Sequence, residues 1–262
     1  MVKDIHSRTA WIAAALFTLF AAAVAIVALV FPGGRRYNVG HVRWWGRALL
    51  RLARVGIEGR DLEKIPAEGS CIYVSNHQSM LDIPAVLAVL PGRVRFMAKR
   101  SLFRIPIFGW CLSLEGFVPV DRADRNKARQ SLNPARKALG TGTRLFVFPE
   151  GTRSRTGRVG TFKTGAFRLA IDTGVPIVPI AIVGAEKVLP PGRKRVRRGT
   201  ITVIAGDPID PTTYSANQRH KLKDRAREWI VKTKTEAENR TEESDRSQDR
   251  SESCETDGPD GS

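Results

Sequence analysis

The sequence predicts a single α/β domain with a mostly parallel sheet flanked by helices, preceded by an N-terminal transmembrane helix. Two features predict this, namely an apolar run near the N-terminus and short apolar segments that alternate with helical ones, while an acidic C-terminal end predicts a disordered tail. We therefore divide the 262 residues into an anchor at 1–34, an amphipathic interfacial helix at 35–55, the α/β domain at 56–235 and a disordered acidic tail at 236–262.

The N-terminal segment is predicted to be a membrane anchor. Residues 11–31 form a charge-free apolar run of 21 positions, and a helix that crosses a bilayer needs about 20. A cleaved signal peptide is the alternative because Lys3 and Arg8 precede the run, but the run is long for a signal peptide and no clear A-x-A cleavage site accompanies it. We expect a protein of the cell membrane, either single-pass or peripheral.

Arginines after the apolar run predict the orientation of the anchor. They are Arg35, Arg36, Arg43, Arg47, Arg51 and Arg54. Because only two basic residues precede the run, the positive-inside rule predicts that the folded domain lies on the cytoplasmic side.

The segment 35–55 has the periodicity of an amphipathic helix. Its last four arginines share one face, and the opposite face carries Val42, Trp45, Leu49 and Leu52. This pattern is typical of a helix in the membrane interface. An ordinary surface helix that packs its apolar stripe on the domain would show the same periodicity, and the position beside the anchor favours the interface.

Between residues 56 and 235, short apolar runs alternate with helical stretches. The expected strands are 71–75, 94–98, 117–120, 145–148, 177–182 and 201–205. The expected helices are 79–90, 101–114, 126–139, 163–173 and 215 to about 235. Strands separated by helices of about 10 to 15 residues indicate a largely parallel sheet.

The formal net charge of +17 is unevenly distributed. Residues 236–262 hold ten acidic and three basic side chains and almost nothing apolar, which predicts disorder, and the preceding 235 residues carry +24. Such a field implies an anionic partner, and the predicted anchor favours a membrane with anionic lipids over nucleic acid. The three cysteines show no metal-ligand spacing, so they indicate a reducing compartment and neither a disulfide framework nor a metal site.

His77 and Asp82 form the first candidate site. They follow the expected strand 71–75, and open α/β sheets bind ligands at the carboxyl ends of their strands. If His77 lies in the loop and Asp82 in the first helical turn, the carboxylate can fix the ring's tautomer and leave the other nitrogen free to accept a proton. The alternative is structural: Ser79 and Asp82 resemble a capping box, and His77 is then a loop histidine bonded to backbone.

A second cluster follows the expected strand 145–148. Residues 148–157, FPEGTRSRTG, contain two glycines, three hydroxyl side chains and two arginines. Backbone N–H groups, hydroxyls and guanidinium groups all donate to anions, so the loop predicts a phosphate site. It lacks the GxxxxGK[ST] pattern of nucleotide triphosphate sites. The alternative is a solvated basic loop in which Glu150 pairs with an arginine.

Together, the two clusters resemble the glycerolipid acyltransferase family, whose best-known members are the 1-acyl-glycerol-3-phosphate acyltransferases. The resemblance covers about residues 55–210 and consists of four blocks in the family's order. The blocks are the H-x4-D segment at 76–82, GFVPVDR at 116–122, FPEGTRS at 148–154 and VPIVP at 175–179. The proline at position 149 is the form associated with acylation of lysophosphatidic acid.

The resemblance implies an acyltransferase of phospholipid biosynthesis without a metal or other cofactor. It would move a fatty acyl group from acyl-CoA or acyl carrier protein to the 2-hydroxyl of lysophosphatidic acid. His77 would be the general base, and Asp82 would orient and stabilise the imidazolium. Because a thiolate leaves readily, the harder step is to activate the alcohol, which requires a general base and no covalent nucleophile. The absence of a GxSxG motif from the sequence agrees with this. The acceptor's phosphate and glycerol would be held by Arg122, Glu150, Gly151, Thr152 and Arg153.

Within that set Glu150 is expected to orient an arginine or a hydroxyl, because a bare carboxylate repels phosphate. Lys99, which directly follows the expected strand 94–98, is a further phosphate candidate by the same resemblance. A surface lysine at a strand end is the alternative. Lys163 is a weaker candidate that would neutralise the neighbourhood.

The run Arg193–Arg198 has five basic residues in six and is expected to bind anionic lipid. Docking of an acidic acyl carrier protein is a second interpretation, and a nucleic-acid motif is disfavoured because no aromatic stacking pattern accompanies the run. Two other functions remain as alternatives for the whole chain. One is acylation of glycerol-3-phosphate or another lysophospholipid. The other is a non-catalytic, membrane-tethered basic module that binds anionic lipid or nucleic acid, which would leave both clusters without a role.

Overall fold

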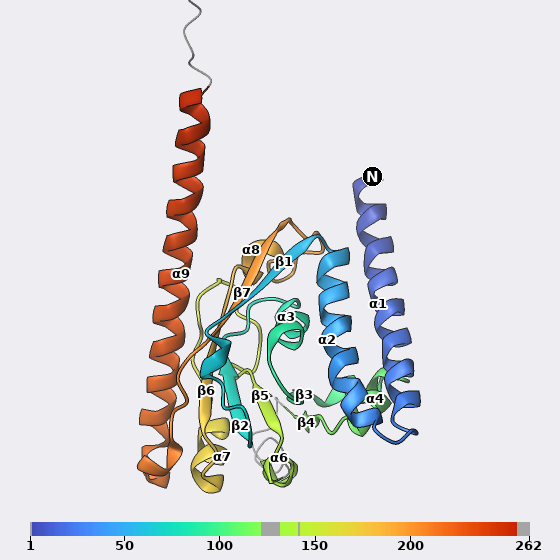
Figure 1. The fold of residues 1–262 in the computed structure, drawn as a ribbon, viewed down its shortest axis with the longest axis vertical. Coiled ribbons are helices and arrows are strands. Elements are labelled where there is room, and N and C mark those ends of the chain that lie inside the picture. Colours follow the sequence, from blue (N-terminus) through green and yellow to red (C-terminus); the bar gives the residue numbers. More distant parts are fainter. Residues whose placement is uncertain (1, 122–131, 141, 256–262) are drawn as a thin grey trace, which may run out of the picture.

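The structure is a computed structural model that describes residues 2–121, 132–140 and 142–255. Seven strands of this part form one sheet in the order β1-β7-β6-β2-β5-β3-β4 (Figure 1). They are β1 Val55–Arg60, β2 Cys71–Ser75, β3 Val94–Lys99, β4 Val118–Val120, β5 Arg144–Val147, β6 Ile177–Val183 and β7 Gly199–Ala205. All neighbouring pairs are parallel except β6 and β7, which confirms the predicted mostly parallel sheet.

Helices cover both faces of the sheet (Figure 1). One core contains residues of α2 Gly34–Leu52 and α3 Asp82–Val89, and the other contains residues of α6 Leu132–Leu139, α7 Gly165–Thr173 and α9 Arg219–Glu255. The short α4 Phe108–Leu114 and α8 Ala185–Val188 follow β3 and β6. Strands β2, β5 and β6 lie between these layers and are buried along their whole length, which explains their near-continuous apolar sequences.

The main differences between the expected elements and the structure before α7 are at β1 and in two helices. Strand β1 was not predicted, because it is an edge strand with two glycines and exposed charges, and only Val55 is buried. The expected helix 101–114 is divided into a 3-10 segment Arg100–Arg104 and α4, since Pro106 interrupts it. The expected helix 126–139 is seen from Leu132, and residues 126–131 lie outside the described residues.

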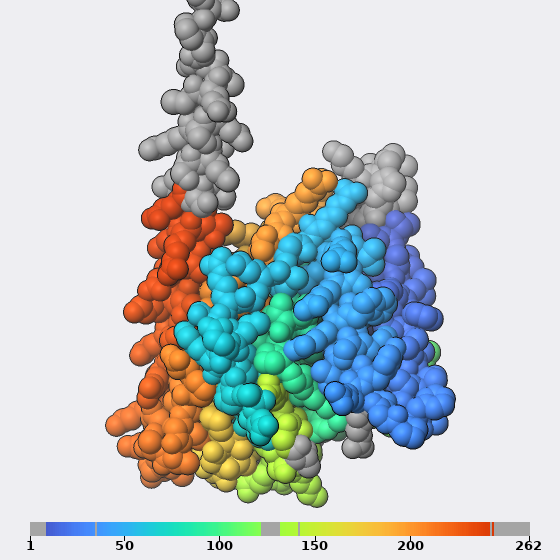
Figure 2. All heavy atoms as spheres, viewed as in Figure 1, coloured from blue at the N-terminus to red at the C-terminus, as the bar shows by residue number. Residues whose placement is uncertain are grey.

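Helix α1, Val2–Ala28, contains most of the predicted span 11–31, whose last three residues lie past the end of the helix, and it packs on the domain as well. Its segment Thr9–Ala28 is long and apolar enough to cross a membrane, by length and composition. On one side Ala21, Ala22 and Ala25 are buried, and Asn38 Nδ2 of α2 donates to the Ala25 carbonyl at 3.1 Å. Figure 2 shows α1, in dark blue, lying against α2, in lighter blue, so the helix is part of the domain's packing as well as a candidate anchor.

Helix α2 lies against α3, with two of its arginines directed at the protein. Arg43 Nη2 donates to the Leu90 carbonyl at 2.8 Å, and Arg47 Nε donates to the Ala88 carbonyl at 3.1 Å. Cations are favourable at a helix C-terminus, where carbonyls lack partners. A Cβ at Gly46 would lie 2.6 Å from the Pro84 carbonyl oxygen, so glycine permits this close approach. These contacts favour a helix that packs on the domain.

The last helix is longer than the sequence predicted. The structure places residues 236–255 in α9, where we expected a disordered tail, and Figure 1 shows this helix extending past the sheet. Part of the reason is Lys234, whose ammonium is nearly buried and donates to Glu186 at 2.9 Å and to Glu238. Ala237 is buried as well, so the first turn of the expected tail packs on the domain.

Candidate active site

Parallel pairing of β2 and β5 brings the two predicted clusters together. The register pairs Tyr73 with Phe146 and Val74 with Val147, a constant offset of 73 residues. Continued past the strand ends, this offset sets His77 opposite Glu150. The His77 N–H donates to Glu150 Oε1 at 2.8 Å, so the alignment persists into the loops.

His77 and Asp82 form a buried pair. His77 Nδ1 lies 2.7 Å from Asp82 Oδ2, with His77 in the loop and Asp82 as the first residue of α3. The same oxygen accepts from the backbone N–H groups of Gln78 at 2.7 Å and Ser79 at 2.9 Å. The Asp82 carboxylate therefore has both of the expected roles: it accepts from backbone N–H groups before the helix, and it orients the His77 ring.

The His77 ring is held from one side by Phe148. Their centroids are 3.9 Å apart with the planes at 16°, so the rings stack. Nε2 has no hydrogen-bond partner in the described part of the chain, and it is the nitrogen left to accept a proton. The sequence analysis assigned no role to Phe148, although this residue opens the FPEGTRS block. An aromatic residue at the end of a strand was the signal that could have identified it as a contact of the site.

Glu150 has a different role from the one expected. Its carboxylate accepts from the His77 N–H and, through Oε2, from the Gly160 N–H at 2.9 Å, so it orients backbone instead of an arginine or a hydroxyl. Burial raises the pKa of Glu150 above its ordinary value, and the two N–H donors oppose this rise by stabilising the ionised form.

The remaining predicted residues lie in the loop after β5, at the end of β3 and outside the described part of the chain. Thr152 and Arg153 are exposed on the loop after Glu150. Gly151 adopts φ 76°, and a Cβ there would meet Lys163 Nζ at 3.0 Å, so glycine lets Lys163 lie against the loop. Lys99 is exposed at the end of β3, two strands from β2, or about 10 Å at the usual strand spacing. Arg122 lies outside the described residues.

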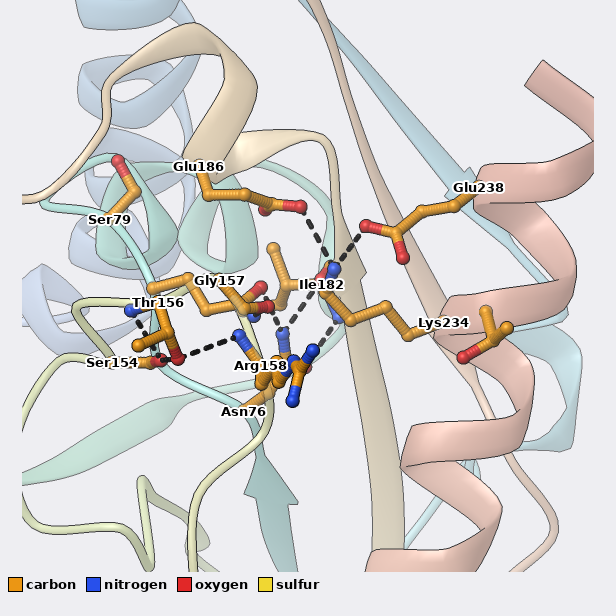
Figure 3. A network of polar contacts seen from close by, with 12 residues as sticks. Asn76, Ser79, Ser154, Thr156, Gly157, Arg158, Ile182, Glu186, Lys234 and Glu238 are labelled. Carbon is orange, nitrogen blue, oxygen red and sulfur yellow. Dashed lines mark hydrogen bonds and ion pairs between the residues drawn. The ribbon is translucent and has the colours of Figure 1, made fainter. Parts of the chain in front are cut away.

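The loop after β5 is attached to the His77 segment at two further points. Ser154 N–H donates to the His77 carbonyl at 2.8 Å, and the Gln78 amide donates to the Gly157 carbonyl. Asn76 joins the same segment to β6, because it donates to the Ile182 carbonyl at 2.8 Å and accepts from its N–H at 2.9 Å (Figure 3). Neither Gln78 nor Asn76 was assigned a role from sequence, and both are almost fully buried.

An apolar cavity of about 100 Å³ lies between α1, α2, α3 and α4. Its walls include Ala22, Val42, Trp45, Leu87 and Phe117. A row of aromatic rings leads from it to His77: Phe117 is 5.8 Å from Phe96, and Phe96 is 6.1 Å from Phe148. The described part of the chain thus holds a buried His77–Asp82 pair, a loop with exposed cationic side chains and an apolar cavity. In the part of the chain described, no group of three His, Cys, Asp or Glu side chains could hold a metal ion.

Comparisons with known proteins agree with this combination. A family model described as acyltransferase matches residues 56–183. A chloroplastic 1-acyl-sn-glycerol-3-phosphate acyltransferase of Brassica napus is 40% identical over 168 residues, which are 63% of this chain and 48% of that protein. The enzyme of the same name from Haemophilus influenzae is 33% identical over 71% of this chain and 77% of its own length.

A solved structure is similar over most of the chain. The crystal structure of the 1-acyl-sn-glycerophosphate (LPA) acyltransferase from Thermotoga maritima aligns with a TM-score of 0.78 and 27% identity. The alignment covers 88% of this chain and 94% of that one. Against the chloroplast relatives of Brassica napus and Arabidopsis thaliana, the chain spans about half of their length.

Proposed function

This chain belongs to the acyltransferase family that includes the 1-acyl-sn-glycerol-3-phosphate acyltransferases, and we propose that it makes phosphatidic acid from lysophosphatidic acid. The donor is an acyl thioester, either acyl-CoA or acyl carrier protein. The observation that carries the proposal is the buried His77–Asp82 pair, 2.7 Å apart, whose backbone is hydrogen-bonded to the cationic loop after β5.

His77 acts as general base. Nε2 takes the proton of the acceptor's 2-hydroxyl while that oxygen attacks the thioester carbonyl. The C–S bond then breaks, and the thiolate leaves and takes the proton from the imidazolium, which returns the ring to its neutral form. Asp82 holds the proton on Nδ1 and stabilises the imidazolium by its charge. No acyl-enzyme forms on this route.

The cationic loop binds the acceptor's phosphate. Thr152 and Arg153 are exposed and can donate a hydroxyl and a guanidinium, and Lys163 adds a positive charge beside Gly151. Lys99, at the end of β3, is a further proposed phosphate ligand, and Arg122 is proposed as one from the sequence alone. Glu150 holds the loop and contributes no contact to the phosphate, which explains a carboxylate in an anion site.

The apolar cavity receives an acyl chain. It is lined by helices α1 to α4, and the packed rings of Phe117, Phe96 and Phe148 lie between it and the His77 ring. Because Ala22 and its neighbours on α1 form part of the wall, α1 serves the site as well as the membrane.

The proposed placement at a membrane rests on the outer surface of α1 and on the basic run Arg193–Arg198. Phe20, Val30 and Phe31 of the N-terminal segment are exposed apolar side chains. The indole N–H of Trp11 donates to the Lys194 carbonyl at 2.6 Å, so the apolar helix and the basic run meet on one side of the molecule. Apolar and basic groups together favour a membrane containing anionic lipid over nucleic acid or a carrier protein.

The decisive assay uses the purified full-length protein in detergent with lysophosphatidic acid, glycerol-3-phosphate and lysophosphatidylcholine as acceptors. We expect acyl transfer to lysophosphatidic acid, and His77→Ala should lower kcat by about 10² to 10⁴. Preference for glycerol-3-phosphate would favour the related acylation. Absence of transfer from both acyl-CoA and acyl carrier protein, with retained binding to anionic vesicles, would favour the non-catalytic module.

A further inference from the structure

Helix α9 reaches the active-site loop through Arg227, outside the segment that the family model matches. Its apolar stripe, Leu222, Ala226 and Ile230, is completely buried against the sheet and fixes the rotation of the helix. One residue after Ala226, the half-buried Arg227 points to the loop between β5 and α7. Its Nε donates to the Gly160 carbonyl and its Nη2 to the Val159 carbonyl, each at 2.9 Å.

The peptide group between Val159 and Gly160 connects this arginine to Glu150. Its carbonyl, that of Val159, accepts from Arg227, and its N–H, that of Gly160, donates to Glu150 Oε2 at 2.9 Å. A cation at one end and a carboxylate at the other polarise the peptide in the same direction, so each hydrogen bond strengthens the other. A Cβ at Gly160 would lie 2.8 Å from Glu150 Oε2, so the approach depends on glycine.

Glu150 continues the connection to the base. Its other oxygen accepts from the His77 N–H at 2.8 Å, and it is largely buried. The series Arg227, Val159–Gly160, Glu150 and His77 therefore runs from α9 to the His77 backbone without a gap. We propose that Arg227 is a positioning residue for the acyl transfer, which sets His77 through the Val159–Gly160 peptide and Glu150. The kinetic part of this inference rests on the proposed function.

Attachment of α9 to the domain does not depend on Arg227. The helix is held by its apolar stripe and by Lys234, which bridges Glu186 of α8 and Glu238 of α9 (Figure 3). Loss of Arg227 should therefore leave α9 in place and release only the loop. This separation distinguishes a positioning role from a structural one.

The test compares Arg227→Met and Arg227→Lys with Arg225→Met in the full-length protein. Arg225 is an exposed arginine on the same helix that donates to the Tyr214 hydroxyl at 3.2 Å and does not reach the loop. A displacement of about 1 Å in a catalytic constellation can cost about 100-fold. We expect kcat to fall about 10- to 100-fold in Arg227→Met, with the thioester KM unchanged. Arg227→Lys should fall less, because an ammonium can still reach one carbonyl, and Arg225→Met should match the wild type.

A double-mutant cycle with Glu150→Gln decides whether the effect passes through Glu150. If it does, Arg227→Met should cost less than about 3-fold in the Glu150→Gln background, because the connection is already broken. An equal cost in both backgrounds, or a wild-type kcat in Arg227→Met alone, would overturn the proposal. If Arg227→Met does not fold, Arg227→Lys enters the same cycle.

Amide hydrogen exchange provides a readout that needs no substrate. We expect the Ser154 and Gly160 amides to exchange faster in Arg227→Met than in Arg225→Met, with α9 amides around Leu222 and Ile230 unchanged. Unchanged exchange in the loop would contradict the proposal. If the wild-type protein acylates none of the acceptors tested, the proposed function fails, and exchange alone still decides whether Arg227 fixes the loop.

Discussion

The charge on Asp82 should contribute to kcat by an amount that the structure allows us to estimate. Asp82 is completely buried, and its Oδ2 lies 2.7 Å from His77 Nδ1. During transfer the ring becomes an imidazolium, and opposite charges about 4 Å apart interact by about 4 kcal/mol at an effective dielectric constant of about 20. That energy corresponds to about 10³ in rate. Asp82→Asn keeps the size of the side chain and removes the charge, so we expect kcat to fall about 10²- to 10³-fold.

Folding should be less affected than catalysis in this variant. The asparagine oxygen can still accept from the Gln78 and Ser79 N–H groups, which lie 2.7 and 2.9 Å from Asp82 Oδ2 in the native protein. A matched control is Asp210→Asn, because Asp210 also accepts from a nearby backbone N–H, that of Thr212 at 2.8 Å. The control should retain wild-type kcat.

The assay is steady-state acyl transfer to lysophosphatidic acid in detergent, with thermal unfolding of each variant measured in parallel. A kcat for Asp82→Asn within about tenfold of wild type, in a folded protein, would refute the role of Asp82 in stabilising the imidazolium. Equal losses in Asp82→Asn and Asp210→Asn would instead indicate a general effect of substitution on the fold.

Three further predictions follow from the loop and the cavity. Arg153→Lys should raise the KM for lysophosphatidic acid and leave the thioester KM unchanged, because lysine keeps the charge but loses paired donation; a raised thioester KM alone would assign the loop to the donor. Glu150→Gln should gain thermal stability relative to wild type as pH rises above about 4.5, because burial raises the pKa of Glu150 and makes its ionised form costly in the folded state. Melting temperatures of both proteins at pH 4 to 7 check this, and a difference in melting temperature that does not change with pH would contradict it. Ala22→Phe should shift donor preference to shorter acyl chains, since it fills part of a cavity of about 100 Å³; unchanged preference across a chain-length series would place the acyl chain elsewhere.

The sequence predicted most of the sheet because its central strands are buried on both faces. Cys71–Ser75 was predicted with the bounds that the structure shows, and five other strands were predicted within two residues at each end. Such strands consist of nearly continuous apolar residues between turn signals, a pattern that survives without knowledge of the partners. The edge strand Val55–Arg60 lacks this pattern and was missed.

Local sequence also identified His77 and Asp82 as a possible pair, because their relation depends only on where the helix begins. The structure starts α3 at Asp82, and the two side chains meet. For Glu150, local reasoning assigned the wrong partner. Its partners are backbone N–H groups at residues 77 and 160, and the residue type alone contains no information about which groups approach it.

Tertiary structure decided the remaining relations, and the physical reason is the same in each. The parallel register of β2 with β5 sets His77 opposite Glu150, the burial of one stripe of α9 directs Arg227 to the loop, and the packing of α1 on α2 makes the apolar cavity. Each depends on pairing between segments distant in the chain, where hydrogen-bond register and side-chain packing select one arrangement among many with similar local patterns. The sequence by itself determined the chemical groups and the element in which each lies; their distances and partners follow from the fold.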